Sequence, residues 1–186
     1  MKKYELTEET REWYGITLHR IKALKDIGSS VKAGDLGGWV QSENNLSHKG
    51  GCWVHGNARV CDNAEVYSNA RVYGNAEVHG DAEVYGNARV CGDAEVYGNA
   101  LVREKANIQS TADYITVGPI GSRDDFTTFY RTSTKGNEIY VKCGCKNTDI
   151  DTWLAMVEKT HGNNKHGKMY REAAELAYMQ IKKLED

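Results

Sequence analysis

The chain has 186 residues, with 24 lysines and arginines against 26 aspartates and glutamates, and a formal net charge of −2 at pH 7. This length predicts one domain or two small ones, and the near-neutral charge argues against a nucleic-acid-binding surface. No stretch approaches the roughly 18 apolar residues of a membrane helix, and no apolar signal core follows Met1. Its five cysteines are most simply reduced thiols, so we expect a protein of the cytoplasm that does not bind membranes.

Residues 1–37 carry no repeat. Residues 4–7 and 17–24 alternate apolar and polar side chains as strands do, although the second segment also suits a short helix. The open end of a repetitive β structure must be covered, because its first turn otherwise presents unpaired strand edges. We therefore expect residues 1–37 to form an N-terminal β cap.

Residues 38–114 hold a six-residue repeat, and such a fixed period predicts architecture before local propensity does. An aliphatic residue and an alanine recur two positions apart, so on a strand both point to one side. The residues between successive units are mostly Gly, Asn, Asp or Ser, which tolerate tight turns. The first series is Val54, Val60, Val66, Val72, Val78, Val84, Val90, Val96, Val102 and Ile108, and the second is Ala58, Ala64, Ala70, Ala76, Ala82, Ala88, Ala94, Ala100, Ala106 and Ala112.

This periodicity is typical of a parallel β-helix. A helix would contain a glycine in most units, each costing about 1 kcal/mol, and the strands are too short for a flat hairpin sheet. Three short strands per turn would bury every valine and alanine. Degraded units at 38–40, 44–46, 52–54, 106–108 and 112–114 extend the series to about four coils, which is sufficient for stability once the ends are covered.

Residues eighteen positions apart should lie above one another in neighbouring coils. The position between alanine and valine then gives one acidic and one basic column, and like charges stacked in this way repel modestly. A threefold assembly would set Glu65 and Glu83 of one chain against Arg71 and Arg89 of the next, which predicts a homotrimer. The alternative is solvated charge on a duplicated repeat. The three columns are Arg59, Glu77, Glu95; Glu65, Glu83, Leu101; and Arg71, Arg89, Asn107.

The position after valine predicts a stack of Tyr67 on Tyr85, with Arg103 one coil further. It also places Cys61 beneath His79. Two ligands on a flat column do not make a tetrahedral zinc site, so we expect no metal there.

Residues 115–186 predict a small α+β module. Strands at 126–132 and 138–143, joined across 133–137, would form a hairpin or part of a three-stranded sheet. Thr148 would cap a first helix with Asp151 as its capping-box partner, and His161-Gly162 would end it. Asn163 or Asn164 would cap a second helix. The expected apolar stripes are Ile150, Trp153, Leu154 and Val157 in the first helix, and Tyr170, Ala173, Ala174, Ala177, Ile181 and Leu184 in the second.

A candidate anion site lies in the glycine-rich segment 117–128 and at the start of the second helix. Turn glycines and a helix N-terminus can direct backbone N–H groups at a phosphate or a nucleotide. The segment matches neither the P-loop nor the dinucleotide glycine pattern. The alternative is a structural turn in which Arg123 pairs with Asp124 or Asp125. The candidate residues are Gly118, Gly121, Ser122, Arg123, Thr127, Thr128, Lys165 and His166.

Four possible zinc ligands also occur in this module, namely Cys143, Cys145, His161 and His166. A CxC pair chelates less well than CxxC, and the two histidines straddle a helix boundary. We therefore expect structural thiols, with no metal and no cofactor.

Two resemblances extend these expectations. The unit Val72-Tyr-Gly-Asn-Ala76-Glu resembles the hexapeptide-repeat proteins, which implies a left-handed β-helix. The segments Tyr4-x-Leu-Thr, Gly34-Asp-Leu-Gly-Gly-Trp-Val and Cys52-Trp-Val resemble a family of small phage and prophage proteins that pair such a cap with such coils. This second resemblance covers about residues 1–112. It implies a phage origin without implying a reaction, since most members are uncharacterised.

These features favour a non-catalytic phage or prophage protein that inhibits a host system, such as a defence system, by binding a host protein or a small nucleotide. One alternative is an acyltransferase using acyl-CoA, because the hexapeptide-repeat proteins that this chain resembles are best known as such enzymes, with a histidine as general base. The only candidate base is His48, in the short loop 47–51, so we assign no catalytic residue. The other alternative is a structural component of the virion.

Overall fold

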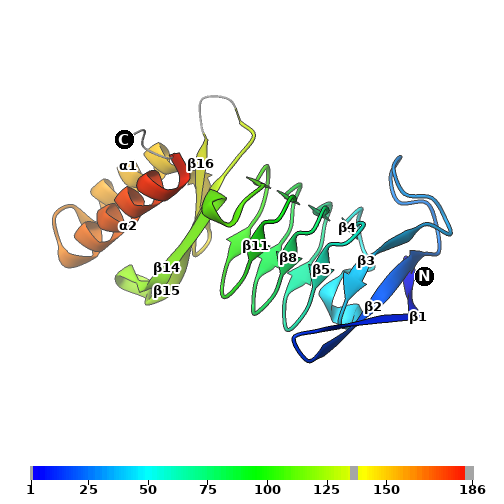
Figure 1. Ribbon diagram of the computed structural model, residues 1–186. Helices are drawn as coiled ribbons and strands as arrows, with labels where there is room; N and C mark the ends of the chain where they lie inside the picture. Colours follow the sequence, from blue (N-terminus) through cyan, green and yellow to red (C-terminus); the bar gives the residue numbers. More distant parts are fainter. Residues whose placement is uncertain (1, 135–137, 183–186) are drawn as a thin grey trace. The chain divides into compact units, whose positions relative to one another are not determined.

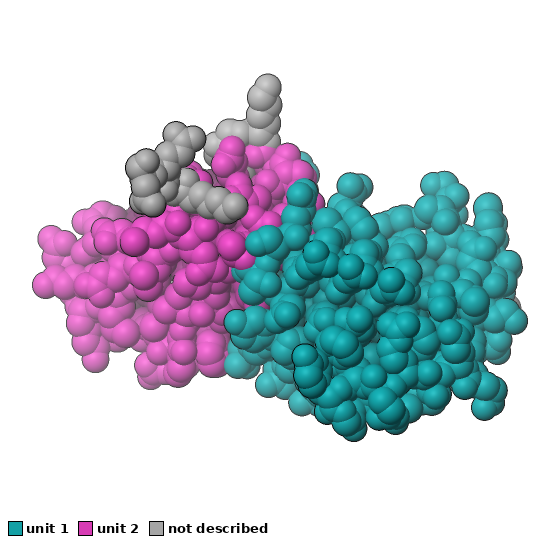
Figure 2. Space-filling model, viewed as in Figure 1, with its two compact units in different colours: residues 1–105, 109–111 teal, residues 106–108, 112–186 magenta. Residues whose placement is uncertain are grey.

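The computed structural model describes residues 2–134 and 138–182. The chain divides into two compact units (Figure 2). The first comprises residues 1–105 with 109–111, and the second residues 106–108 with 112–186. No helix among the described residues is long and apolar enough to span a membrane.

The N-terminal segment is a β cap, as predicted (Figure 1). Strand β1 (Tyr4–Trp13) pairs antiparallel with β2 (Ile16–Ala23), which in turn pairs antiparallel with β3 (Leu36–Val40). The possible helix at 17–24 is therefore excluded. Because β3 also pairs parallel with β5 of the repeat, one strand edge of the first coil is covered.

The repeat forms a parallel β-helix of about four turns, with three short strands in each turn. Its three parallel sheets follow the orders β3-β5-β8-β11, β4-β7-β10 and β6-β9-β12. Alanine and valine side chains fill the interior, with exposed fractions of 0% throughout residues 58–102. The strands are β4 (Trp53–Val54), β5 (Arg59–Val60), β6 (Glu65–Val66), β7 (Arg71–Val72), β8 (Glu77–Val78), β9 (Glu83–Val84), β10 (Arg89–Val90), β11 (Glu95–Val96) and β12 (Leu101–Val102).

The degraded unit at 44–46 occupies a strand position, as predicted. Leu46 bridges Val66 in parallel, after a 3₁₀ turn η1 (Glu43–Asn45) that Ser42 caps. Asn45, the residue before Leu46, is fully buried. Its Nδ2 donates to the carbonyl oxygens of Asp62 at 3.0 Å and Ala64 at 2.9 Å, which satisfies a polar group inside an apolar core.

The prediction of a further repeat unit at 112–114 was wrong. Thr111–Asp113 forms a 3₁₀ turn, η2, and Tyr114 begins an antiparallel strand. Every repeat corner from Gly56 to Glu104 has a residue with positive φ, but Ser110, at the next corner, does not. Without that left-handed corner the chain leaves the coil path, and Ala112 is partly exposed instead of buried.

The second unit contains a four-stranded antiparallel sheet in the order β14-β15-β16-β17, larger than the predicted hairpin or three-stranded piece. Helices α1 (Ile150–His161) and α2 (Lys165–Lys182) contribute to one apolar core with this sheet, in which Phe129, Trp153 and Tyr170 pack edge to face. The remaining elements are β13 (Asn107–Ile108), β14 (Tyr114–Ile120), η3 (Gly121–Arg123), β15 (Asp125–Arg131), β16 (Ile139–Cys143) and β17 (Lys146–Asp149).

The helix caps differ in one place from the prediction. Asp149, and not Thr148, caps α1, because Lys146–Asp149 forms a strand and the helix begins one residue later. The Asp149 carboxylate accepts from Thr152 N at 2.9 Å, which lowers the pKa of Asp149. Asn164 caps α2 as predicted, and α1 ends at His161. The apolar stripes are buried as expected apart from the partly buried Leu154, whereas Leu184 and part of the 133–137 loop lie outside the described residues.

We predict that Gly86→Ala destabilises the first unit more than Gly98→Ala. Both glycines have positive φ, 69° and 65°, so alanine costs about 1–2 kcal/mol at either corner. A Cβ at Gly86 would lie only 2.7 Å from Glu104 N, whereas a Cβ at Gly98 meets nothing within 4 Å. Urea unfolding should show an additional loss of about 1 kcal/mol or more for Gly86→Ala. Equal losses would contradict the close stacking of these corners.

Candidate functional site

The three faces of the β-helix differ in charge, and on one of them an ion pair forms within the chain. On the sheet β5-β8-β11, Arg59 Nη1 lies 2.5 Å from Glu77 Oε1, one coil away. The Arg59 guanidinium also lies over the ring of Trp13, 3.8 Å from its centroid. We call this the hairpin face, because the residue that covers Arg59 belongs to the end of β1.

The acidic face, defined by Glu65 and Glu83, lies on the sheet β6-β9-β12. The two glutamates are in parallel register, as predicted. Glu83 accepts a hydrogen bond of 2.6 Å from the Tyr67 hydroxyl, and burial together with this carboxylate raises the pKa of Tyr67. The predicted aromatic column is confirmed, since Tyr67 stacks on Tyr85 with centroids 4.7 Å apart and Arg103 lies over Tyr85.

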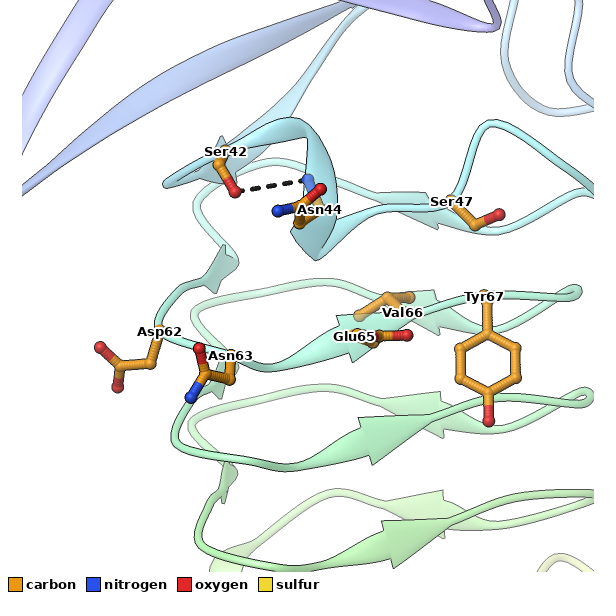
Figure 3. Close-up of a pocket in the computed structure, with 8 residues that line it drawn as sticks. All are labelled: Ser42, Asn44, Ser47, Asp62, Asn63, Glu65, Val66 and Tyr67. Atoms are coloured by element: carbon orange, nitrogen blue, oxygen red, sulfur yellow. Dashed lines mark hydrogen bonds between the residues drawn. The ribbon is translucent and has the colours of Figure 1, made fainter.

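A hollow of about 370 Å³ opens on this face (Figure 3). Figure 3 shows Glu65 and Tyr67 on one coil, below the segment that carries Ser42, Asn44 and Ser47. Its lining is mostly polar, so it can accept hydrogen-bonding groups more readily than an apolar ligand.

The basic face, defined by Arg71 and Arg89, lies on the sheet β4-β7-β10. The two arginines are in register, and with His55 and Tyr73 they line a hollow of about 460 Å³. Arg71 Nη1 donates to Ser30 Oγ at 2.7 Å, which positions the guanidinium without neutralising it. Burial, reinforced by the charge of Arg71, lowers the pKa of His55. The imidazole therefore carries less positive charge at neutral pH than a free histidine does.

None of Glu65, Glu83, Arg71 or Arg89 forms an ion pair within residues 2–134 and 138–182. Like charges placed opposite one another on neighbouring strands destabilise a sheet. Two faces of the same coils therefore carry unneutralised charge of opposite sign, and an external group of the opposite charge would stabilise each of them.

The predicted anion site is only partly assembled in the second unit. Ser122 and Arg123 line a hollow of about 250 Å³, in which Lys146 and His161 provide further nitrogen donors. Lys165 and His166 do not line this hollow. A site with an arginine and a lysine can hold a small anion such as a phosphate group.

The other predicted anion-site residues have structural roles. Thr127 and Thr128 are buried in β15, where Thr127 Oγ1 contacts Cys143 Sγ at 3.3 Å. Gly121 lies against the hydroxyl group of Tyr170, where a Cβ would be 1.9 Å from the oxygen. Gly118 precedes a cis proline and packs against the backbone of Phe126.

The contribution of Lys146 to this hollow was not predicted, and His161 and the two cysteines were considered as possible metal ligands or as structural residues. Cys143 and Cys145 do line the hollow together with His161. Within the described part of the chain, no three His, Cys, Asp or Glu side chains are placed so that together they could hold a metal ion. Lys146 begins the strand β17 (Lys146–Asp149). All four residues of this strand are polar, so no apolar alternation in the sequence indicates the strand or the position of Lys146.

His48, the one candidate general base, is engaged on both ring nitrogens. Nδ1 faces the backbone N–H of Lys3 at 3.3 Å, and Nε2 lies 3.4 Å from Glu43 Oε2. The imidazole also stacks on Tyr4, with ring centroids 4.3 Å apart. This arrangement anchors the loop to the cap and leaves no ring nitrogen directed at a substrate.

Comparison with known proteins gives a limited result. No family model matches the chain. A protein of Escherichia coli (strain K12), described as "Uncharacterized acetyltransferase YdcK", is 35% identical over 63 residues. The alignment covers 30% of this chain and 19% of the relative, so the chain spans about a fifth of the relative's length. The similarity to a protein named as an acetyltransferase fits the β-helix fold.

Proposed function

We propose that this chain is a non-catalytic interaction protein of a phage or prophage, which forms a homotrimer in the host cytoplasm and inhibits a host system by binding a host protein or a small nucleotide. The observation that carries the proposal is the pair of unneutralised faces, acidic at Glu65 and Glu83 and basic at Arg71 and Arg89. The resemblance of the cap and coils to phage proteins supports the origin.

The spacing of the charges supports a heterologous contact between copies. Glu65 and Glu83 are separated by one coil, as are Arg71 and Arg89, so the two columns have the same repeat along the β-helix. One face could therefore meet the other with both glutamates opposite both arginines. A contact between two different surfaces of each chain closes into a ring when the rotation permits, and three faces favour a threefold ring.

The state of the hairpin face favours the acidic and basic faces as the two surfaces that meet in the trimer. Arg59 is already paired with Glu77 and covered by Trp13, so the arginine of this face is not available to an acidic partner. Ion pairs that form in a partly desolvated interface fix its register and its partner choice.

Two modes of inhibition remain for the trimer. A host protein could be occluded by a charged face or by the aromatic column of Tyr67 and Tyr85. A nucleotide would bind instead in the second unit, where Arg123 and Lys146 line one hollow. The two modes use different units of the chain and can be tested separately.

We predict that the double substitution Arg71→Glu and Arg89→Glu converts the trimer to monomers. Both interacting faces would then be acidic, and like charges across an interface oppose association. Native mass spectrometry and sedimentation at low salt should show loss of most of the trimer, and added salt should weaken the wild-type trimer.

The matched control is the fourfold exchange in which Glu65 and Glu83 also become arginine. The two faces then exchange signs and complement one another again, so the trimer should return. A wild-type chain that is monomeric, or a double variant with unchanged mass, would refute the assembly.

We predict that nucleotide binding is lost with Arg123→Ala and retained with Lys165→Ala, because Arg123 lines the hollow and Lys165 does not. A ligand at a hundredfold excess over Kd stabilises the folded state by about 2.7 kcal/mol. Thermal unfolding with a panel of nucleotides should show this gain in the wild type and in Lys165→Ala. If no nucleotide raises the unfolding temperature, the remaining mode of inhibition is occlusion of a host protein, which a pull-down from host lysate tests.

Acyl transfer is the second candidate function, favoured by the similarity to a protein named as an acetyltransferase. The engagement of both nitrogens of His48 argues against it. We predict no release of free CoA from acetyl-CoA above the rate of a His48→Asn variant, measured with a thiol reagent. Turnover that is lost in His48→Asn and kept in His55→Asn would overturn the non-catalytic proposal.

A further inference from the structure

Lys3 is a buried lysine with a sulfur partner. Its side chain is 1% exposed, and the neighbouring Cys52 is fully buried. Lys3 Nζ donates to Cys52 O at 2.8 Å and to Cys52 Sγ at 3.1 Å. No carboxylate pairs with Lys3 within the described ranges, although buried lysines are usually paired with one.

The hydrogen bonds around Lys3 match a neutral amine. A neutral amine has two N–H donors, which these two acceptors satisfy, and it retains a lone pair. Burial lowers the pKa of Lys3, because desolvation disfavours the ammonium form. The thiol of Cys52 is placed to donate to Ser47 O at 3.4 Å or Lys49 O at 3.6 Å, so its sulfur remains an acceptor toward Lys3.

The loop 47–51 brings exposed residues close to this pair in the chain, and we infer that a small oxidant enters through it. Lys49 and Gly50 are exposed, and Gly50 and Gly51 have no side chains to shield the sulfur. In the described structure, no other thiol of the first unit has a lysine amine at this distance. Cys61 is also buried, which raises its pKa to about 11, and it serves as the control thiol without an amine partner.

We propose that Lys3 and Cys52 are a modification site, at which peroxide joins the lysine nitrogen to the cysteine sulfur through one oxygen atom. An oxygen inserted between nitrogen and sulfur leaves the two atoms close to their present separation, whereas a direct bond would require them to move much closer. The product is a covalent bridge between the N-terminal cap and the start of β4.

The chemistry requires two molecules of hydrogen peroxide. The first oxidises the Cys52 thiol to a sulfenic acid and leaves as water. The second takes one hydrogen from the sulfenic acid and one from the Lys3 amine as the N–O bond forms, and leaves as two molecules of water. The sulfur and nitrogen together lose four electrons, which the two peroxides accept, so thiol, amine and two peroxides give the bridge and three waters.

The bridge would lock the cap onto the first coil. It joins residues 49 positions apart, and a cross-link that closes a loop of this size restricts the unfolded chain as a disulfide does. We therefore expect the oxidised protein to unfold at a higher temperature than the reduced protein.

The experiment is peroxide treatment of the folded chain, alkylation of free thiols, proteolysis and mass spectrometry. The expected product is a Lys3 peptide joined to a Cys52 peptide, with a mass equal to their sum plus one oxygen and less two hydrogens. Dithiothreitol should return both peptides, because the bridge is reducible. The linked pair should be absent from Cys52→Ser and from Lys3→Met, and present in Cys61→Ser.

The exposed Cys145 reports whether the oxidant acted. Oxidation of Cys145 without a Lys3–Cys52 link would overturn the proposal, as would a link without oxygen or a link to another lysine. Circular dichroism of each variant establishes that it is folded, and a variant that fails this check is replaced by Lys3→Arg or Cys52→Ala.

Discussion

The backbone hydrogen bonds between successive coils are the constraint on which the first unit depends. Arg59 N donates to Ala76 O and Glu65 N donates to Ala82 O, each at 2.9 Å, and the same step of about one coil recurs along the β-helix. Because the donor and acceptor are related by a fixed number of residues, every side chain has a neighbour of the same repeat position above it. Burial of valine and alanine stabilises this register, since a slip of one residue would expose them.

Because of this register, residues at the same repeat position stack in neighbouring coils and together determine the character of a whole face. A single glutamate on an isolated strand is solvated, but Glu65 and Glu83 in register make an acidic strip, and Arg71 and Arg89 make a basic one. The same rule stacks Tyr67 on Tyr85. Among the outward strand positions of the described coils, an ion pair forms where opposite charges share a column, between Arg59 and Glu77. The remaining faces are therefore the surfaces on which binding energy is available.

The sequence was sufficient for the β-helix because its period is long and regular, and the column of Tyr67 and Tyr85 followed from it. The exit at 112–114 was not predictable from composition, since Ser68 takes the left-handed corner that Ser110 does not. The strand Lys146–Asp149 has no alternating apolar residue to signal it, so the cap at Asp149 was assigned to Thr148. The anion site was only partly predictable, because the run Phe126–Tyr130 does not alternate and concealed the burial of both threonines. The burial of Lys3 had no sequence signal.

The three-strand turn also constrains how such a chain can change in length. Strands in contact are eighteen residues apart, as Arg59 and Glu77 are, so a duplication of three units adds a coil and leaves every later side chain on its own face. A duplication of one unit instead rotates all later residues by one face, which would place arginines where glutamates belong. Selection on the surface pattern should therefore tolerate growth in whole coils and oppose growth in single hexapeptides.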